Sequence, residues 1–72
     1  MSKLHDISDL EAHRLNQILD NFSIDAVLGE FNDDWVYICE GRKIFRLARD
    51  QISPDISVRD ACRQITYFDV RG

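Results

Sequence analysis

The chain has 72 residues, of which 44% are hydrophobic and 31% charged, and its formal net charge is -4. This composition is typical of one small globular domain and excludes a disordered chain, and no apolar run approaches the roughly 20 residues that span a bilayer. Cys39 and Cys62 are too few for a disulfide framework. We therefore expect a single domain over residues 1–72.

The first six residues lack the apolar core of a secretory signal, so we expect a cytoplasmic protein. In that compartment both cysteines stay reduced, and we interpret them as small buried hydrophobic residues. The charge is unevenly distributed. Residues 1–40 carry nine acidic and two basic side chains, whereas residues 41–72 carry seven basic and four acidic ones. Such asymmetry bears on the choice of partner rather than on the fold.

A first helix is predicted over residues 9–21. Ser8 and Glu11 have the spacing of a capping box, in which the side chain of each residue binds the backbone amide of the other. Apolar residues then recur at helical spacing, namely Leu15, Ile18, Leu19 and Phe22. This pattern favours a helix with one buried face.

Three strands are predicted next, over residues 26–31, 35–39 and 43–48. The segment from Asn32 to Asp34 has turn chemistry, and Gly41 fits a hairpin position that requires positive φ. Gly29 indicates a bulge or a close backbone approach within the first strand. The third strand has an alternative, because Ile44, Leu47 and Ala48 also sit at helical spacing. We prefer the strand, because the turn glycine precedes β-favouring residues.

A second helix is predicted after Pro54. Ser57 is its expected N-cap, and apolar side chains would line one face, namely Val58, Ala61, Cys62, Ile65 and Phe68. The residues after Phe68 are expected to fray. The predicted fold is a small α+β domain: a helix, a three-stranded antiparallel meander and a second helix.

No pattern in the sequence indicates catalysis, so we expect a protein that is not an enzyme and binds no cofactor. His5, Asp9 and His13 are four residues apart and could hold a metal, but solvent-facing polar side chains are the simpler interpretation. Glu30, Asp33 and Asp34 could form a carboxylate pair, but a turn offers no cleft to shift their pKa values.

The candidate binding residues are aromatic and basic. Trp35 and Tyr37 lie on one face of the second strand, and if both helices cover the other face, Trp35, Tyr37 or Phe31 is exposed; otherwise Trp35 belongs to the core. Basic residues on the third strand, joined by Arg59 and Arg63, could bind phosphates or simply be solvated. The partner-binding set predicted from the sequence is Trp35, Tyr37, Arg42, Lys43, Arg46 and Arg49.

In length, acidic charge and lack of disulfides and catalytic motifs, the chain resembles the small host-takeover proteins of bacteriophages. In particular it is similar to those, known from a Xanthomonas phage, that bind host RNA polymerase. The resemblance implies a regulator that acts in the host cytoplasm and binds a larger host enzyme. Bound to RNA polymerase, it would inhibit the initiation of transcription or promote antitermination, or both. Phage inhibitors of bacterial immune nucleases and antitoxins share this format. A nucleic-acid-binding module that uses the basic residues 42–49 is the other alternative.

Overall fold

The computed structural model describes residues 8–70. Their order is a helix, three strands, a 3-10 turn, a short helix and a fourth strand. The elements are α1 (Asp9–Phe22), β1 (Ala26–Phe31), β2 (Trp35–Glu40), β3 (Lys43–Ala48), η1 (Arg49–Gln51), α2 (Val58–Arg63) and β4 (Thr66–Val70). The strands form one antiparallel sheet in the order β1-β2-β3-β4. The predicted small α+β domain with an antiparallel meander is confirmed.

Both helices begin as the sequence predicts. At α1 the Ser8 hydroxyl accepts from the Glu11 amide at 3.1 Å, and the Glu11 carboxylate accepts from the Ser8 amide at 3.2 Å, which completes the capping box. At α2 the Ser57 hydroxyl accepts from the Asp60 amide at 3.1 Å. These side chains satisfy amides that the first turn of a helix leaves without a backbone acceptor.

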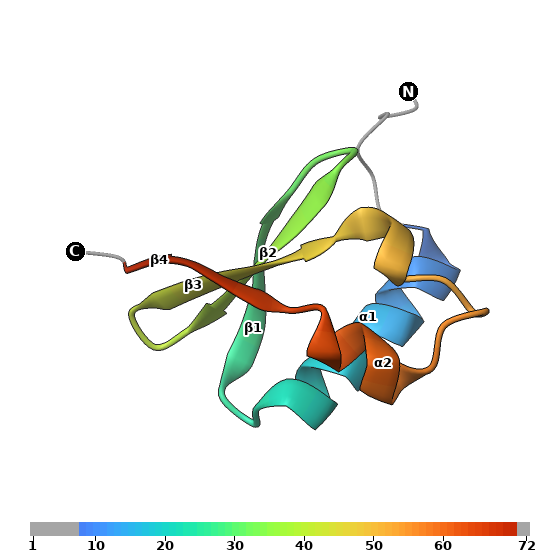
Figure 1. Ribbon diagram of the computed structural model, residues 1–72, viewed down its shortest axis with the longest axis horizontal. Coiled ribbons are helices and arrows are strands. Elements are labelled where there is room, and N and C mark those ends of the chain that lie inside the picture. The colour runs from blue at the N-terminus through green and yellow to red at the C-terminus, as the bar shows by residue number, and fades with distance from the viewer. Residues whose placement is uncertain (1–7, 71–72) are drawn as a thin grey trace.

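Figure 1 shows α1 and α2 side by side on one side of the twisted sheet. The core lies between the two layers and consists of Leu15, Ile18, Leu19, Val36, Ile38, Leu47, Ile52 and Ala61. On β2, the side chains of Val36 and Ile38 face the helices and are 0% exposed. Because strand side chains alternate, Trp35, Tyr37 and Cys39 face the opposite side, which we call the open face.

The alternative of a helix over residues 43–52 is not adopted. Lys43 to Ala48 form β3, which pairs along its whole length with β2, and Gly41 takes φ 61° at the turn between them. A glycine adopts this left-handed conformation without the steric cost that a Cβ adds. Only the short turn η1 follows.

The C-terminal part differs from the prediction. We expected a second helix that includes Ile65 and Phe68, but α2 ends at Arg63, and Thr66 to Val70 form β4 beside β3. The sheet therefore has four strands in the described part of the chain rather than three. Thr66, Tyr67 and Phe68 are β-branched or aromatic and favour a strand when a partner strand is available. Here β3 provides the partner, which a local pattern of residues does not reveal.

Candidate binding face

The open face carries a cluster of rings around one guanidinium. Cζ of Arg46 lies 4.0 Å from the centroid of the Trp35 ring and 5.2 Å from that of Phe68. The rings of Tyr37 and Phe68 are 5.2 Å apart, centroid to centroid. We call Trp35, Tyr37, Arg46 and Phe68 the aromatic–arginine cluster. Its members come from β2, β3 and β4, so the sheet itself holds them in place.

Arg46 is fixed by these rings rather than by a carboxylate. It makes no ion pair with another residue between 8 and 70, and its side chain is half-buried. When a guanidinium stacks on an aromatic ring, its N–H groups lie in its own plane, roughly parallel to the ring, and remain accessible to a hydrogen-bond acceptor. Arg46 is therefore positioned for binding without a structural hydrogen bond to break.

Two β-bulges shape this face. The register between β1 and β2 shifts between Leu28 and Phe31, so that Gly29 and Glu30 both lie opposite Tyr37. The register between β3 and β4 shifts at Ile44 and Phe45, which leaves Phe68 as the extra residue on β4. A bulge redirects the side chain that it inserts. The first bulge turns Glu30 and the second turns Phe68 toward the open face.

Between the bulges the open face is hollowed into a trough of about 440 Å³. Its lining residues are Gly29, Glu30, Asn32, Tyr37, Cys39, Ile44 and Phe68. A Cβ on Gly29 would lie 3.1 Å from both Sγ of Cys39 and the carbonyl oxygen of Tyr37. The glycine thus permits the close approach predicted from the sequence and leaves the β1 end of the trough unobstructed.

The structure brings three of the six predicted binding residues together, namely Trp35, Tyr37 and Arg46. Arg42 and Lys43 lie at the β2–β3 turn, where they border a second hollow with Asp25 and Glu40. Phe31, which was a candidate for exposure, lies opposite Val36 and packs against the core.

Arg49 is held within the fold by an ion pair, a backbone hydrogen bond and an aromatic ring. Its guanidinium forms a two-bond ion pair with the Glu11 carboxylate, at 3.2 Å for each bond, and donates to the carbonyl oxygen of Asn32 at 2.8 Å. Cζ of Arg49 also lies 5.6 Å from the Phe31 ring centroid, and the side chain is only 12% exposed. The hydrogen bond from Arg49 is the main cause that holds the pKa of Glu11 below its usual value. Arg49 therefore links α1 to the β1–β2 loop.

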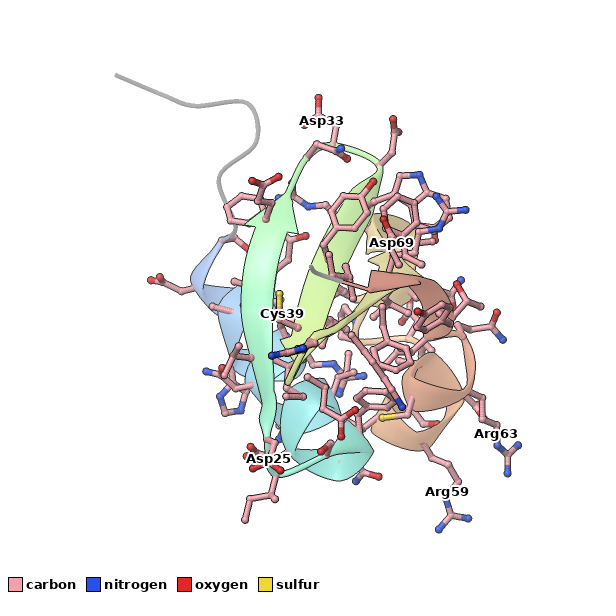
Figure 2. All side chains as sticks on the ribbon, turned by 90° about the vertical axis from the view of Figure 1, so that its left-hand side faces the viewer. Asp25, Asp33, Cys39, Arg59, Arg63 and Asp69 are labelled. Atoms are coloured by element: carbon pink, nitrogen blue, oxygen red, sulfur yellow. The ribbon has the colours of Figure 1, made fainter. Side chains whose placement is uncertain are left out.

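The remaining basic residues do not complete a single cationic patch. Arg59 and Arg63 extend from α2 away from β1 and β2 (Figure 2), and Arg63 lies 3.9 Å from Asp60. The basic side chains thus occupy at least three separate parts of the molecule. The basic residues between 8 and 70 therefore do not assemble the continuous phosphate-binding surface that the sequence left open.

The other sequence candidates offer little chemistry. His5 lies outside the described residues, and within 8–70 no group of three or more His, Cys, Asp or Glu side chains could hold a metal ion. Glu30, Asp33 and Asp34 are exposed. Cys39 and Cys62 are half-buried rather than fully buried. The Cys62 thiol donates to the carbonyl oxygen of Ile18 at 3.3 Å, and burial raises its pKa.

Three contributors to the open face were not predicted from the sequence: Phe68, Glu30 and the trough itself. Phe68 was assigned to a helix, although the β-favouring run from Thr66 to Val70 is a signal for a strand. The position of Glu30 follows from the bulge, which Gly29 indicated without giving its direction.

Two further observations bear on function. None of the helices within residues 8–70 has the length and apolar character needed to cross a membrane. Comparisons of the chain with protein-family models, with curated proteins and with solved structures find no match.

Proposed function

We propose that this protein is a small non-catalytic regulator that binds a larger protein through the open face of its sheet. The observation that carries the proposal is the aromatic–arginine cluster on the face that the helices leave uncovered. Tryptophan, tyrosine and arginine are the residues that most often dominate binding energy at protein interfaces. Trp35 and Tyr37 are half-buried and Phe68 is 48% exposed, and aromatic rings that remain partly exposed beside a hollow are typical of docking sites.

The class of partner follows from the resemblance to phage host-takeover proteins. Bacterial RNA polymerase is the first candidate, and the regulator would inhibit initiation or let elongation pass terminators. A bacterial immune nuclease is the second. In either case the small protein would act by occupying a surface of the enzyme, which requires no active site of its own.

The test is direct binding to purified bacterial RNA polymerase, as core enzyme and as holoenzyme, measured by biolayer interferometry. The double variant Trp35→Ala and Arg46→Glu should weaken binding by roughly 30-fold or more, since loss of an interface hot spot costs about 2 kcal/mol or more. The double variant Arg59→Glu and Arg63→Glu is the control, because it changes charge on α2, away from β1 and β2. Both variants should retain the far-ultraviolet circular dichroism of the wild type.

The results separate the parts of the proposal. Tight binding that the open-face variant leaves unchanged would rule out the open face as the interface. If the polymerase does not bind, the polymerase assignment fails, and the immune-nuclease complex becomes the next purified target. Where the polymerase binds, transcription past a terminator in the purified system shows whether the protein inhibits initiation or promotes antitermination.

One observation favours the alternative of single-stranded nucleic acid. Aromatic side chains on the open face of an antiparallel sheet can stack bases, and Arg46 could contact a phosphate. Two observations argue against nucleic acid. Glu30 lines the trough and the chain has a net charge of -4, and both repel a phosphate backbone. Fluorescence anisotropy with a labelled oligonucleotide at low salt decides the matter. Binding that is lost on Arg46→Glu would support the alternative.

A further inference from the structure

The charged side chains of the first two strands and of their loop are all acidic. From Ile24 to Gly41, a segment that contains β1, β2 and their loop, the chain has no lysine, arginine or histidine. Its charged side chains are Asp25, Glu30, Asp33, Asp34 and Glu40. Figure 2 shows Asp25 and Asp33 at opposite ends of β1, with Cys39 of the open face between them. A partner that lies along β1 therefore meets Glu30 on the strand and Asp25 and Asp33 beyond its two ends, with Arg42 and Lys43 bordering Asp25.

The strand β1 is also an uncovered edge. It is the first strand in the sheet order, so one side of its backbone has no neighbouring strand within the described residues. The side chains of Val27 and Leu28 are 58% and 39% exposed, on the open face and the helix-side face respectively. An edge strand with exposed apolar side chains is a template on which another strand can pair through main-chain hydrogen bonds.

The trough opens at this same edge. Gly29 leaves its β1 end without a side chain, and the bulge places Glu30 at its rim. Tyr37, Ile44 and Phe68 form an apolar floor beyond it. A strand added beside β1 could therefore insert one apolar side chain over the floor while its neighbours reach Glu30 and Asp25.

Charge disfavours a second copy of this chain as the occupant. When two β1 strands pair, each copy brings Asp25 and Glu30 to the shared edge, and the segment from Ile24 to Gly41 supplies no basic side chain to offset them. Like charges that face each other across two strands are destabilising.

We propose that the edge of β1 and the trough bind an extended segment of a partner protein that carries lysine or arginine on either side of an apolar residue. This inference rests on the proposed function, because it specifies how the open face engages its partner. It identifies the partner segment by chemistry: basic, extended and able to add one strand to the sheet. Opposite-charge pairs across strands and the apolar contact supply the affinity.

The probe is the capped heptapeptide Thr-Lys-Val-Phe-Val-Lys-Thr. In an extended conformation its two lysines and its phenylalanine share one face, which matches the spacing of Asp25, just before β1, and of Val27 and Glu30 on the open face. Titration into the ¹⁵N-labelled protein should shift the amide resonances of β1 and of the trough residues, and the shifts should decrease as salt increases. A matched peptide with glutamate in place of lysine should cause no such shifts.

The charge variant is Asp25→Asn combined with Glu30→Gln. It should weaken peptide binding roughly two- to thirtyfold, because it removes two cross-strand charge pairs that contribute about 0.2–1 kcal/mol each. The control variant, Asp20→Asn with Asp55→Asn, removes the same total charge from exposed positions outside the sheet and should bind as the wild type does. This comparison separates local recognition from the effect of net charge.

Three results would overturn the inference: equal shifts from the lysine and glutamate peptides, no shifts from either, or shifts confined to α1 and α2. Dimerisation of the protein through β1, detected by sedimentation, would also overturn it in favour of a second copy. Failure here is distinct from failure of the proposed function. If the Trp35 and Arg46 variant still abolishes binding to the polymerase, the open face is the interface and only the basic-segment mode is wrong.

Discussion

Arg46 and Arg49 are three positions apart and have different roles. Arg46 stacks on Trp35 and Phe68 at the surface and makes no ion pair with another described residue. Arg49 is nearly buried and binds Glu11 and the backbone of Asn32. In the sequence both residues belong to one basic stretch, because no local pattern shows that α1 lies beside the end of β3. The surroundings of each guanidinium, rather than its charge, distinguish the structural Arg49 from Arg46, for which we propose a role in binding.

This contrast predicts different effects on stability. Arg49→Ala should lower the free energy of unfolding by about 1.5–3 kcal/mol, since hydrogen bonds to charged groups contribute that much and the Glu11 carboxylate loses its partner. Arg46→Ala should lower it by less than about 1 kcal/mol, the usual contribution of an exposed cation–π contact. Urea denaturation followed by far-ultraviolet circular dichroism measures both. Equal destabilisation by the two variants would contradict these assignments.

The ion pair between Glu11 and Arg49 also predicts a pH dependence. The Arg49 hydrogen bond lowers the pKa of Glu11 in the folded chain below its ordinary value of 4.5. The unfolded chain therefore binds the proton more readily, so the stabilisation is complete above about pH 4.5 and is lost as the pH falls through the lowered pKa. In Glu11→Gln, the decrease in urea midpoint between about pH 5 and pH 3 should be smaller than in wild type. A decrease of the same size would show that the pair contributes nothing.

The local patterns that predicted the elements succeeded where a strand has its partner next to it in the chain. The helix α1 and strands β1 to β3 begin within one residue of the predicted positions, because caps, turn residues and alternation are all local signals. The strand β4 was missed because Ile65 and Phe68 fit a helical period, while its actual stabilisation comes from β3, about 20 residues away. The open face could not be fully predicted for the same reason, since Phe68 lies on it only because β4 pairs with β3.

The pairing of β4 can be measured through its rings. Phe45 lies between Phe22 and Tyr67, with centroid distances of 5.1 Å and 5.6 Å, so these rings connect α1, β3 and β4 on the helix side of the sheet. A double-mutant cycle of Phe45→Leu and Tyr67→Leu should give a coupling energy of about 0.5–1.5 kcal/mol. The matched cycle of Phe45→Leu and Phe68→Leu should give a value near zero, because Phe68 lies on the opposite face. Equal coupling in both cycles would argue against this strand register.

The sheet has one face packed against the helices and one open face, which we propose as the binding face. All the buried apolar side chains of β2 and β3 point toward the helices, whereas the aromatic–arginine cluster contributes to the other side. A chain of 72 residues has a free energy of unfolding of only about 4–11 kcal/mol, so its single thin core has little stability to lose. Side chains on the open face can consequently be adapted to a partner without removing any of the core contacts that keep the chain folded.

Two neighbouring residues of β2 test this division. Ile38→Ala removes a side chain that is 0% exposed at the centre of the core and should cost about 2–5 kcal/mol, enough to unfold a large fraction of the molecules near physiological temperature. Tyr37→Ala removes a larger side chain from the open face and should cost less than half as much, because Tyr37 is only half-buried and its ring contact is with the exposed Phe68. Thermal and urea denaturation give both values. In a binding assay at low temperature the order of the two effects should reverse. Tyr37→Ala should lose affinity for the partner, whereas the folded fraction of Ile38→Ala should keep it. If Tyr37→Ala proves as destabilising as Ile38→Ala, the aromatic–arginine cluster is a second core, and the interface must lie on another surface.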